Sequence, residues 1–371
     1  MKRKEIVYLC ALNNIFIYRP ILASKLISMT GSVEDIFRMN ARDLTLNLGI
    51  GVNYVSRILD KSELEIAERE LEWADKSGVD ILTPTDDRYP KRLKECPDAP
   101  LILFYKGTAD LNRSRMISIV GTRSASNYGV NTCRDIVHSL SKLSEKPVVI
   151  SGLAYGIDIT AHLAAMECGL ETIAVMATGL DRIYPAYHRK YAVSIVKKGG
   201  LLSDFPSKTD PVAINFLQRN RVIAGLADAI ILIESKIKGG GMNTASLANS
   251  YSREVLALPG RVNDEKSAGC NLLISKNIAQ SIYSSATVAN QLGWQDKNST
   301  KKSDGLTILL TDTPEKVAIL RTLFEMGEPL DFDQISTHST IAVQDVMATL
   351  VEMEMEERVI ATRGNRYQLR K

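Results

Sequence analysis

The sequence lacks the features that would indicate a membrane, secretory or metal-dependent protein. No apolar run among its 371 residues approaches the roughly 20 residues of a membrane helix, and the first apolar stretch is broken by Asn13, Asn14 and Arg19. Its four histidines show no HExxH or paired spacing. We therefore expect no membrane association, no secretory signal and no metal centre.

Cysteine is scarce and shows no pairing pattern. The five cysteines are widely spaced, odd in number and without a CxxC pair, which argues against a zinc site or a disulfide framework. Isolated thiols of this kind are typical of a reducing cytoplasm, which we predict as the location. These residues are Cys10, Cys96, Cys133, Cys168 and Cys270.

The whole chain has no large excess of positive or negative residues, but the two signs are unevenly distributed along it. The 46 Lys and Arg residues against 43 Asp and Glu leave a net charge of +3, which by itself argues against a strongly electropositive nucleic-acid binder. By region, the net charge is −1 over residues 1–105, +7 over 106–290, zero over 291–313 and −3 over 314–371. The positive charge is thus concentrated centrally, as expected for a phosphate-binding surface.

These regions also differ in hydrophobic pattern, and the length predicts two or three domains. Residues 1–105 have mainly helical spacing, and the turn around Gly49 and Gly51 resembles a SAM-like or helix-hairpin-helix turn, although a plain helical hairpin fits better. Residues 291–313 are polar and are interpreted as a linker. Residues 314–371 show three helices and two strands turning at 364–365, the outline of a winged helix.

The central region, residues 106–290, alternates short apolar runs with helix-length segments. Strands are expected at 117–120, 148–151, 172–176, 201–203, 229–233 and 255–258, because these runs are mostly β-branched or apolar. Helices are expected between them, at roughly 128–143, 157–168, 187–197, 216–226 and 243–252. This alternation predicts a Rossmann-like α/β fold whose parallel sheet is covered by helices on both faces.

The winged-helix region is acidic where a DNA reader would be basic. Its expected third helix, residues 343–357, carries Asp345 and four glutamates but no Lys or Arg. DNA phosphates repel such a helix, so we expect this domain to contact protein rather than a duplex.

Five polar or glycine-containing segments occur in the central region, and they begin at residues 121, 152, 215, 239 and 259. Each segment follows a predicted strand or lies in the helix after one. The carboxyl ends of parallel strands meet at one edge of a sheet, where helix N-termini offer N–H groups to phosphate. Arg123 would add a bidentate phosphate ligand, and the glycines at 239–241 form a backbone nest suited to an anion. Neither GxxxxGK[ST] nor GxGxxG occurs in this region, which disfavours a P-loop triphosphatase and standard dinucleotide binding.

Several of these residues have two interpretations. Asp158 fits a catalytic acid or a charge at a helix N-terminus, and Phe216 fits a base-stacking ring or a core aromatic. Arg123 fits a phosphate ligand or a surface residue on a tight turn. Arg219 and Arg221, two positions apart, cannot share one helical face, so one is expected to pair internally while the other faces the crevice.

The order of the motifs resembles the DNA-processing protein A family, also called Smf, over about residues 106–283. The resemblance implies a non-enzymatic, homodimeric protein without cofactor that binds and protects single-stranded DNA and loads RecA recombinase during natural transformation. It rests on Val-Gly-Thr-Arg at 120–123, Ser-Gly-Leu-Ala-x-Gly-Ile-Asp at 151–158, Gly-Leu-Asp-x-x-Tyr-Pro at 179–185, Arg-Asn-Arg-Val-Ile-Ala-Gly-Leu at 219–226, Gly-Gly-x-x-x-Thr-Ala at 239–245 and Leu-Pro-Gly at 258–260.

In that family the arginine of the first turn contacts DNA phosphate, and the Phe-x-x-Arg-Asn-Arg segment lines the same pocket. Two departures occur here: Ala213 stands where members often carry Lys or Arg, with Lys208 as the nearest upstream base, and residues 188–190 add two cations. Together, the turns and the resemblance predict a DNA-binding site made of Gly121, Thr122, Arg123, Ser124, Gly152, Lys208, Asn215, Phe216, Arg219, Asn220, Arg221, Gly240 and Gly241.

An enzyme acting on a nucleotide is the alternative. The turn at 239–244 also resembles that of nucleoside-monophosphate phosphoribohydrolases, which place a Glu just after the turn. Here Ala245, Ser246 and Leu247 follow, with no carboxylate. We therefore expect no catalytic residues, and we keep a pure adaptor role, carried by the winged-helix region, as a third possibility.

Overall fold

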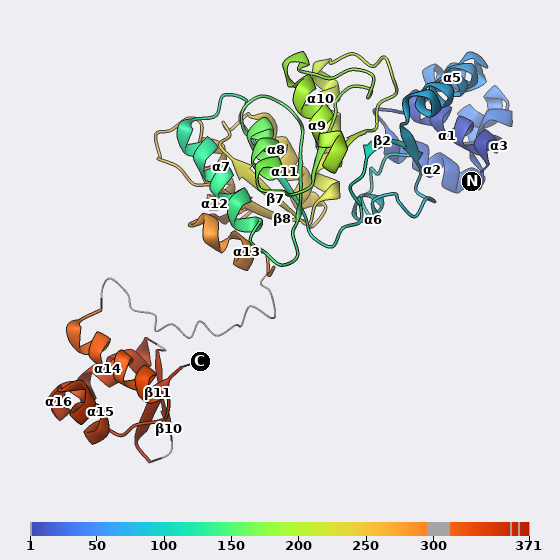
Figure 1. The fold of residues 1–371 in the computed structure, drawn as a ribbon. Coiled ribbons are helices and arrows are strands. Elements are labelled where there is room, and N and C mark those ends of the chain that lie inside the picture. Colours follow the sequence, from blue (N-terminus) through green and yellow to red (C-terminus); the bar gives the residue numbers. More distant parts are fainter. Residues whose placement is uncertain (1, 295–311, 357, 363, 371) are drawn as a thin grey trace. The chain divides into compact units, whose positions relative to one another are not determined.

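A computed structural model describes residues 2–294, 312–356, 358–362 and 364–370 (Figure 1). The chain divides into two compact units, residues 1–295 and 296–371, and each is described by itself. Most of the predicted linker, residues 295–311, lies outside the described residues.

The first unit is built on one nine-stranded sheet with the order β1-β2-β6-β5-β4-β3-β7-β8-β9. The strands from β6 to β9 run parallel, whereas β2 pairs antiparallel with β6 and β1 antiparallel with β2. All six predicted strands are present. The nine strands are Asp80–Leu82, Leu103–Gly107, Met116–Gly121, Val148–Ser151, Thr172–Val175, Gly200–Ser203, Ala229–Ile233, Glu254–Ala257 and Gln280–Ser281.

Helices cover both faces of this sheet because its central strands are apolar on both sides. On β3, Ile117 and Ile119 pack with α7 and α8, whereas Met116 and Val120 pack toward α10 and α11. This alternation is the pleat of a buried strand. The helices are α7 (Asn127–Leu140), α8 (Ile157–Glu167), α9 (Arg189–Lys198), α10 (Ala213–Leu226), α11 (Gly240–Ser250), α12 (Ala268–Ser275) and α13 (Val288–Gln291), with the 3₁₀ turns η2 (Ala186–His188) and η3 (Ser285–Thr287).

The N-terminal region is helical, as predicted, and lies beside the β2 end of the sheet in Figure 1. Its π-helical turn η1 and α4 are joined through Gly49, which has a φ of +66°. Strands β1 and β2 were not predicted; they place residues 80–107 in the sheet, so the sheet begins before residue 106. The elements are α1 (Arg3–Ile15), α2 (Pro20–Thr30), α3 (Val33–Arg38), η1 (Asp43–Asn47), α4 (Val52–Leu59), α5 (Ser62–Ser77) and α6 (Lys91–Lys94).

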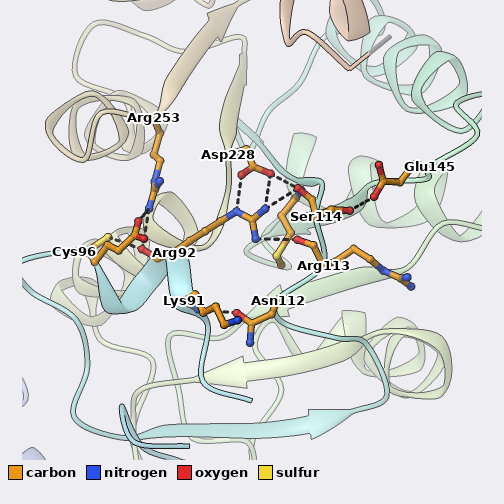
Figure 2. Close-up of polar contacts among 11 residues, drawn as sticks. Lys91, Arg92, Cys96, Asn112, Arg113, Ser114, Glu145, Asp228 and Arg253 are labelled. Carbon is orange, nitrogen blue, oxygen red and sulfur yellow. Dashed lines mark hydrogen bonds and ion pairs between the residues drawn. The ribbon is translucent and has the colours of Figure 1, made fainter. Parts of the chain in front are cut away.

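A partly buried arginine fastens α6 to the amino ends of β3 and β7 (Figure 2). Arg92 forms an ion pair with Asp228, with 2.5 Å between Nε and Oδ1, and donates to the carbonyl oxygens of Arg113 and Ser114, each at 2.8 Å. The Asp228 carboxylate also accepts from the Met116 backbone N–H at 2.8 Å. This cluster links the segment before β3 to the start of β7, on the side of the sheet away from the carboxyl ends.

The loop between β6 and α10 is held by the N-terminal helices. Glu70 of α5 accepts hydrogen bonds from the Ser207 backbone N–H at 2.7 Å and from its hydroxyl at 2.5 Å. Asn13 of α1 donates to the Asp204 carbonyl at 3.3 Å, and the Tyr18 hydroxyl donates to the Asn215 side chain at 2.8 Å. The entry to α10 is therefore positioned by side chains that are far away in sequence.

The second unit has the predicted winged-helix outline. It comprises α14 (Pro314–Met326), α15 (Phe332–Ser339), α16 (Val343–Met355) and the hairpin of β10 (Val359–Thr362) and β11 (Arg366–Leu369). Its own apolar core includes Leu320, Ile335, Leu350 and Val359. On the outer face of α16, the apolar side chains of Val343, Met347, Val351 and Met355 are exposed at intervals of four residues.

Candidate nucleic-acid interface

A cleft of about 660 Å³ opens at the carboxyl ends of β3, β4 and β7. Its walls come from residues 120–123 after β3, Ala154 and Asp158 after β4, Tyr184 after β5, parts of 211–223 on and before α10, and parts of 235–244 at the start of α11. Four of the five predicted segments therefore converge on one site. The fifth does not line the cleft, and within it Gly260 and Asn271 hydrogen-bond to each other.

The turn after β3 is fixed by backbone hydrogen bonds. The Thr122 N–H donates to the Glu234 carbonyl at 2.8 Å, and the Thr122 carbonyl accepts from the Ile157 N–H at 3.2 Å. A Cβ on Gly121 would overlap the Ile233 carbonyl oxygen, so this position needs glycine. The buried Glu234 carboxylate accepts from the Ser126 N–H at 2.8 Å, which fixes the start of α7.

This turn presents an exposed cation against an aromatic ring. The Arg123 guanidinium lies 5.1 Å from the centroid of the Phe216 ring, and the Arg219 guanidinium lies 6.0 Å from the same centroid. Tyr184 meets Phe216 edge-on at 5.5 Å. Phe216 is thus a half-buried ring in the cleft wall rather than a core aromatic, and Arg123 is available to an anion.

Arg219 forms part of the cleft floor and is almost fully buried. Its Nη1 donates to the carbonyl oxygens of Gly152 at 2.8 Å and Val175 at 2.6 Å. Burial lowers the pKa of Arg219, whereas the nearby Asp158 raises it. A Cβ on Gly152 would overlap the guanidinium, so Gly152 acts through Arg219 and does not line the cleft itself.

Asp158 is buried in the first turn of α8, where a negative charge is favoured by the helix dipole. Burial raises the pKa of its carboxyl group, and Arg219 together with backbone groups of Ala154 and Gly152 opposes this shift. These contacts support the interpretation as a charge at a helix N-terminus.

Arg221 points away from the cleft. Its guanidinium forms a buried ion pair with Asp204 and donates to the Asp98 carbonyl. Burial raises the pKa of the Asp204 carboxyl, and Arg221 lowers it. The expectation that one of the two arginines pairs internally is therefore confirmed, and Arg221 does not belong to the cleft.

Other predicted residues also lie outside the cleft lining. Asn215 is buried, accepts from Tyr18 and donates to the Asp210 carbonyl at 2.9 Å. Lys208 is exposed, with a φ of +64°, and its backbone N–H donates to Asp181 at 3.0 Å. Ser124 is exposed beside the turn. The predicted residues that do line the cleft are Gly121, Thr122, Arg123, Phe216, Arg219, Asn220, Gly240 and Gly241.

The last wall of the cleft is the N-terminus of α11. The first N–H groups of a helix have no partner within it and attract anions. Asn220 steadies this end by donating to the Asn243 side chain at 3.3 Å and the Gly240 carbonyl at 3.5 Å. A Cβ on Gly241 would meet the Leu232 side chain at 2.5 Å, which requires the small residue there.

Sequence reasoning missed Tyr184 and Lys236 in the cleft lining. Tyr184 precedes Pro185 in a motif used only for the family resemblance, and no local pattern indicated that its ring meets Phe216. Lys236 follows β7 directly and is paired with Glu265 at 2.8 Å. Its position after a predicted strand was the available signal.

Across the described residues, no group of three or more His, Cys, Asp or Glu side chains could hold a metal ion, and no helix is long and apolar enough to span a bilayer. A Rossmann-like sheet with the N-terminus of α11 and an exposed arginine at its carboxyl edge defines an α/β protein whose cleft is suited to an anion.

Comparison with known proteins identifies the family. The family model for DNA recombination-mediator protein A matches residues 80–293, beginning where β1 begins, and the model for the DprA winged helix domain matches residues 309–365. Protein Smf of Synechocystis is 30% identical over all of both chains. The chain belongs to the DNA recombination-mediator protein A family, also named DprA or Smf.

Two relatives with solved structures share the fold. The X-ray structure of DNA processing protein A from Streptococcus pneumoniae has a TM-score of 0.65 and 30% identity, covering 78% of this chain and 98% of that one. DNA processing protein A from Helicobacter pylori, whose structural description concerns its single-stranded DNA binding mode, has a TM-score of 0.52 and 30% identity, covering 58% and 95%.

Proposed function

We propose that the protein binds single-stranded DNA in this cleft without sequence preference. The observation that carries the proposal is the exposed Arg123 guanidinium against the half-buried Phe216 ring, between the helix N-termini of α8 and α11. The relative from Helicobacter pylori, 30% identical, is described as binding single-stranded DNA and supports the same ligand here.

The cleft offers complementary groups to both parts of a nucleotide. Arg123 and the N-terminal N–H groups of α11 suit phosphate oxygens. The Phe216 ring suits a base face, and stacking of this kind tolerates every base. A duplex keeps its bases stacked internally, so the cleft should favour single strands.

The proposed function includes no catalysis. Among the described residues that line the cleft, Asp158 is the carboxylate, and it is buried against Arg219 and backbone groups. Glu234 is bonded to Ser126 and holds the turn. Neither is presented to a ligand as a phosphoribohydrolase would require, so incubation of the purified protein with AMP should release no free base.

The wider role is also a proposal. We infer that the protein acts in the cytoplasm as a homodimer, protects incoming single strands and loads RecA recombinase during natural transformation. The S. pneumoniae relative, 39% identical over 191 residues, is named DNA processing protein DprA, and this name supports a role in DNA processing. A strand-exchange assay in which RecA must displace a single-strand binding protein tests the loading step.

The winged-helix unit is proposed to contact protein. Its α16 combines acidic side chains with the exposed apolar stripe of Val343, Met347, Val351 and Met355. A chain that ends at about residue 305 should therefore keep its DNA affinity and lose a partner contact. A loss of DNA affinity on truncation would contradict this assignment.

Replacing Arg123 tests the site directly. Arg123→Ala should weaken binding of a labelled thymidine oligonucleotide about tenfold to hundredfold, because a charged hydrogen bond contributes about 1.5–3 kcal/mol. The loss should be similar for all base sequences, and the slope of log affinity against log salt should fall by about one.

The matched control is Arg69→Ala on α5, which removes the same charge from an exposed side chain. It should leave affinity nearly unchanged in the same anisotropy titration. Equal affinities for the parent and Arg123→Ala at moderate salt would refute the proposed site.

A further inference from the structure

Three exposed tyrosines lie at or beside the cleft, Tyr155 before α8 and Tyr184 and Tyr187 before α9. Tyr155 is 48% exposed, Tyr184 is 41% exposed and Tyr187 is 71% exposed. We refer to Tyr155, Tyr184 and Tyr187 as the tyrosine rim. None of them was among the residues predicted to bind DNA.

The tyrosine rim is continuous with the cleft at two points. Tyr184 lines the cleft and meets Phe216 edge-on at 5.5 Å between ring centroids. Tyr155 directly follows Ala154, another lining residue. A strand that leaves the cleft on this side would therefore pass over aromatic rings.

A buried histidine holds the outer rings in place. The Nδ1 atom of His188 donates a hydrogen bond to the Leu153 carbonyl oxygen at 2.8 Å, because a carbonyl oxygen can only accept. The His188 ring lies 4.9 Å from the Tyr155 ring and 6.2 Å from the Tyr187 ring, between centroids. Tyr191 packs on the same imidazole at 6.0 Å. The Tyr155 and Tyr187 rings are thus packed against His188, while both residues remain exposed.

Cations accompany these rings. The Lys190 ammonium lies 4.8 Å from the centroid of the Tyr191 ring and 5.9 Å from that of Tyr187. Arg189 beside it is exposed. Open aromatic faces next to exposed cations are the combination that binds the bases and phosphates of a single strand.

We propose that the tyrosine rim is a second base-binding subsite, which stacks nucleobases of the strand beyond those held in the cleft. This inference rests on the proposed function. Its ligand is the base face of single-stranded nucleic acid, because the rim presents exposed aromatic rings beside cations, and stacking on such rings tolerates every base.

The experiment compares two oligonucleotides of equal charge on the full chain. One is a labelled thymidine oligomer of about 20 nucleotides, long enough to exceed a single short site. The other has the same phosphates but keeps bases only in a short central segment and is abasic elsewhere. Tyr155→Leu and Tyr187→Leu should each weaken binding of the full oligomer about fivefold to hundredfold, and they should leave binding of the abasic oligomer nearly unchanged.

The control is Tyr283→Leu. Tyr283 is 76% exposed and follows β9, at the sheet edge opposite β1, so its loss should not alter either affinity. Tyr187→Phe keeps the flat ring and should bind like the parent. Thermal melting of each variant shows whether the fold is kept, and photo-cross-linking of an iodouracil oligomer to Tyr155 or Tyr187 gives a readout that does not depend on a substitution.

Three outcomes overturn the inference: unchanged affinity of both leucine variants for the full oligomer, equal losses on both oligomers, or a changed oligomeric state without changed affinity. Failure of the parent protein to bind either oligomer would instead refute the proposed function. The two failures are therefore distinguishable.

Discussion

His162 should make the first unit sensitive to acid. The imidazole is wholly buried in α8, and its Nδ1 lies 2.7 Å from the Thr172 hydroxyl oxygen. That hydroxyl donates to the Val149 carbonyl at 2.8 Å, so Nδ1 must be the donor to Thr172. Nε2 is buried without a hydrogen-bond partner, and its protonation would leave a charged donor unpaired.

The size of the effect follows from the pKa. Burial, reinforced by the charges of His188 and Arg219, lowers the pKa of His162 to about 3, against about 6.5 in an unfolded chain. Between these values the unfolded state binds more protons, so stability falls as the pH falls through this window. The free energy of unfolding should lose about 2 kcal/mol at pH 5 and about 3 kcal/mol at pH 4 from this group alone.

Urea unfolding of the parent and of His162→Gln at pH 7 and pH 5 measures this loss. The amide can still donate to Thr172 but does not titrate, so the variant should lack about 2 kcal/mol of the parent's acid destabilisation. Trp73 and Trp294 both belong to the first unit, so tryptophan fluorescence reports that unit. His138→Gln, at an exposed position, is the control.

The comparison isolates His162 from other buried groups. The raised pKa values of Asp158 and Asp204 act in the opposite direction, because those carboxyls favour folding more as the pH falls. Their contribution is common to both proteins and cancels in the difference. Parallel pH dependence of parent and His162→Gln between pH 5 and pH 7 would refute the reasoning.

Three further changes should act on the scaffold. Arg92→Ala removes the ion-pair partner of a partly buried carboxylate and should cost about 1–3 kcal/mol in urea unfolding, whereas loss of the exposed Arg88 pair should cost under about 1 kcal/mol. Arg221→Leu should cost about 3–5 kcal/mol by the same measurement, and adding Asp204→Leu should recover much of it; an additive double variant would contradict the pairing. Gly152→Ala should displace the guanidinium beneath the cleft and weaken oligonucleotide binding in an anisotropy titration, and unchanged affinity would show that this arginine does not support the site.

The central fold could be predicted from sequence because its signals are local. Short apolar runs such as 229–233 are bounded by polar turns and match β7 without shift. Strands β1 and β2 were missed for a physical reason: β1 has three residues, and the apolar run around Leu101 and Tyr105 cannot be told from a helix by periodicity. The pairing of β2 with β6 depends on a contact about 100 residues away along the chain, and β1 in turn pairs with β2.

The site was predictable to the extent that topology determines it. Parallel strands bring their carboxyl ends together, so Arg123 and Gly240 were correctly expected to share a cleft. Helical geometry predicted that the side chains of Arg219 and Arg221 point to different sides of α10. It did not predict which of them forms the internal ion pair, because the partner, Asp204, follows β6 and is distant from local helix signals. The hydrogen bond from Tyr18 to Asn215 is a tertiary contact that no local sequence pattern indicates.

The contacts of the loop from β6 to α10 link the N-terminal helices to the cleft. Its contacts with Asn13, Tyr18 and Glu70 make the N-terminal helices a brace for one wall of the cleft, although these helices do not line it. The brace has its own apolar core, separate from the cores on the two faces of the sheet. Loss of these contacts would therefore free the wall that carries Phe216 while the sheet stayed folded, so ligand binding is coupled to helices that do not line the cleft.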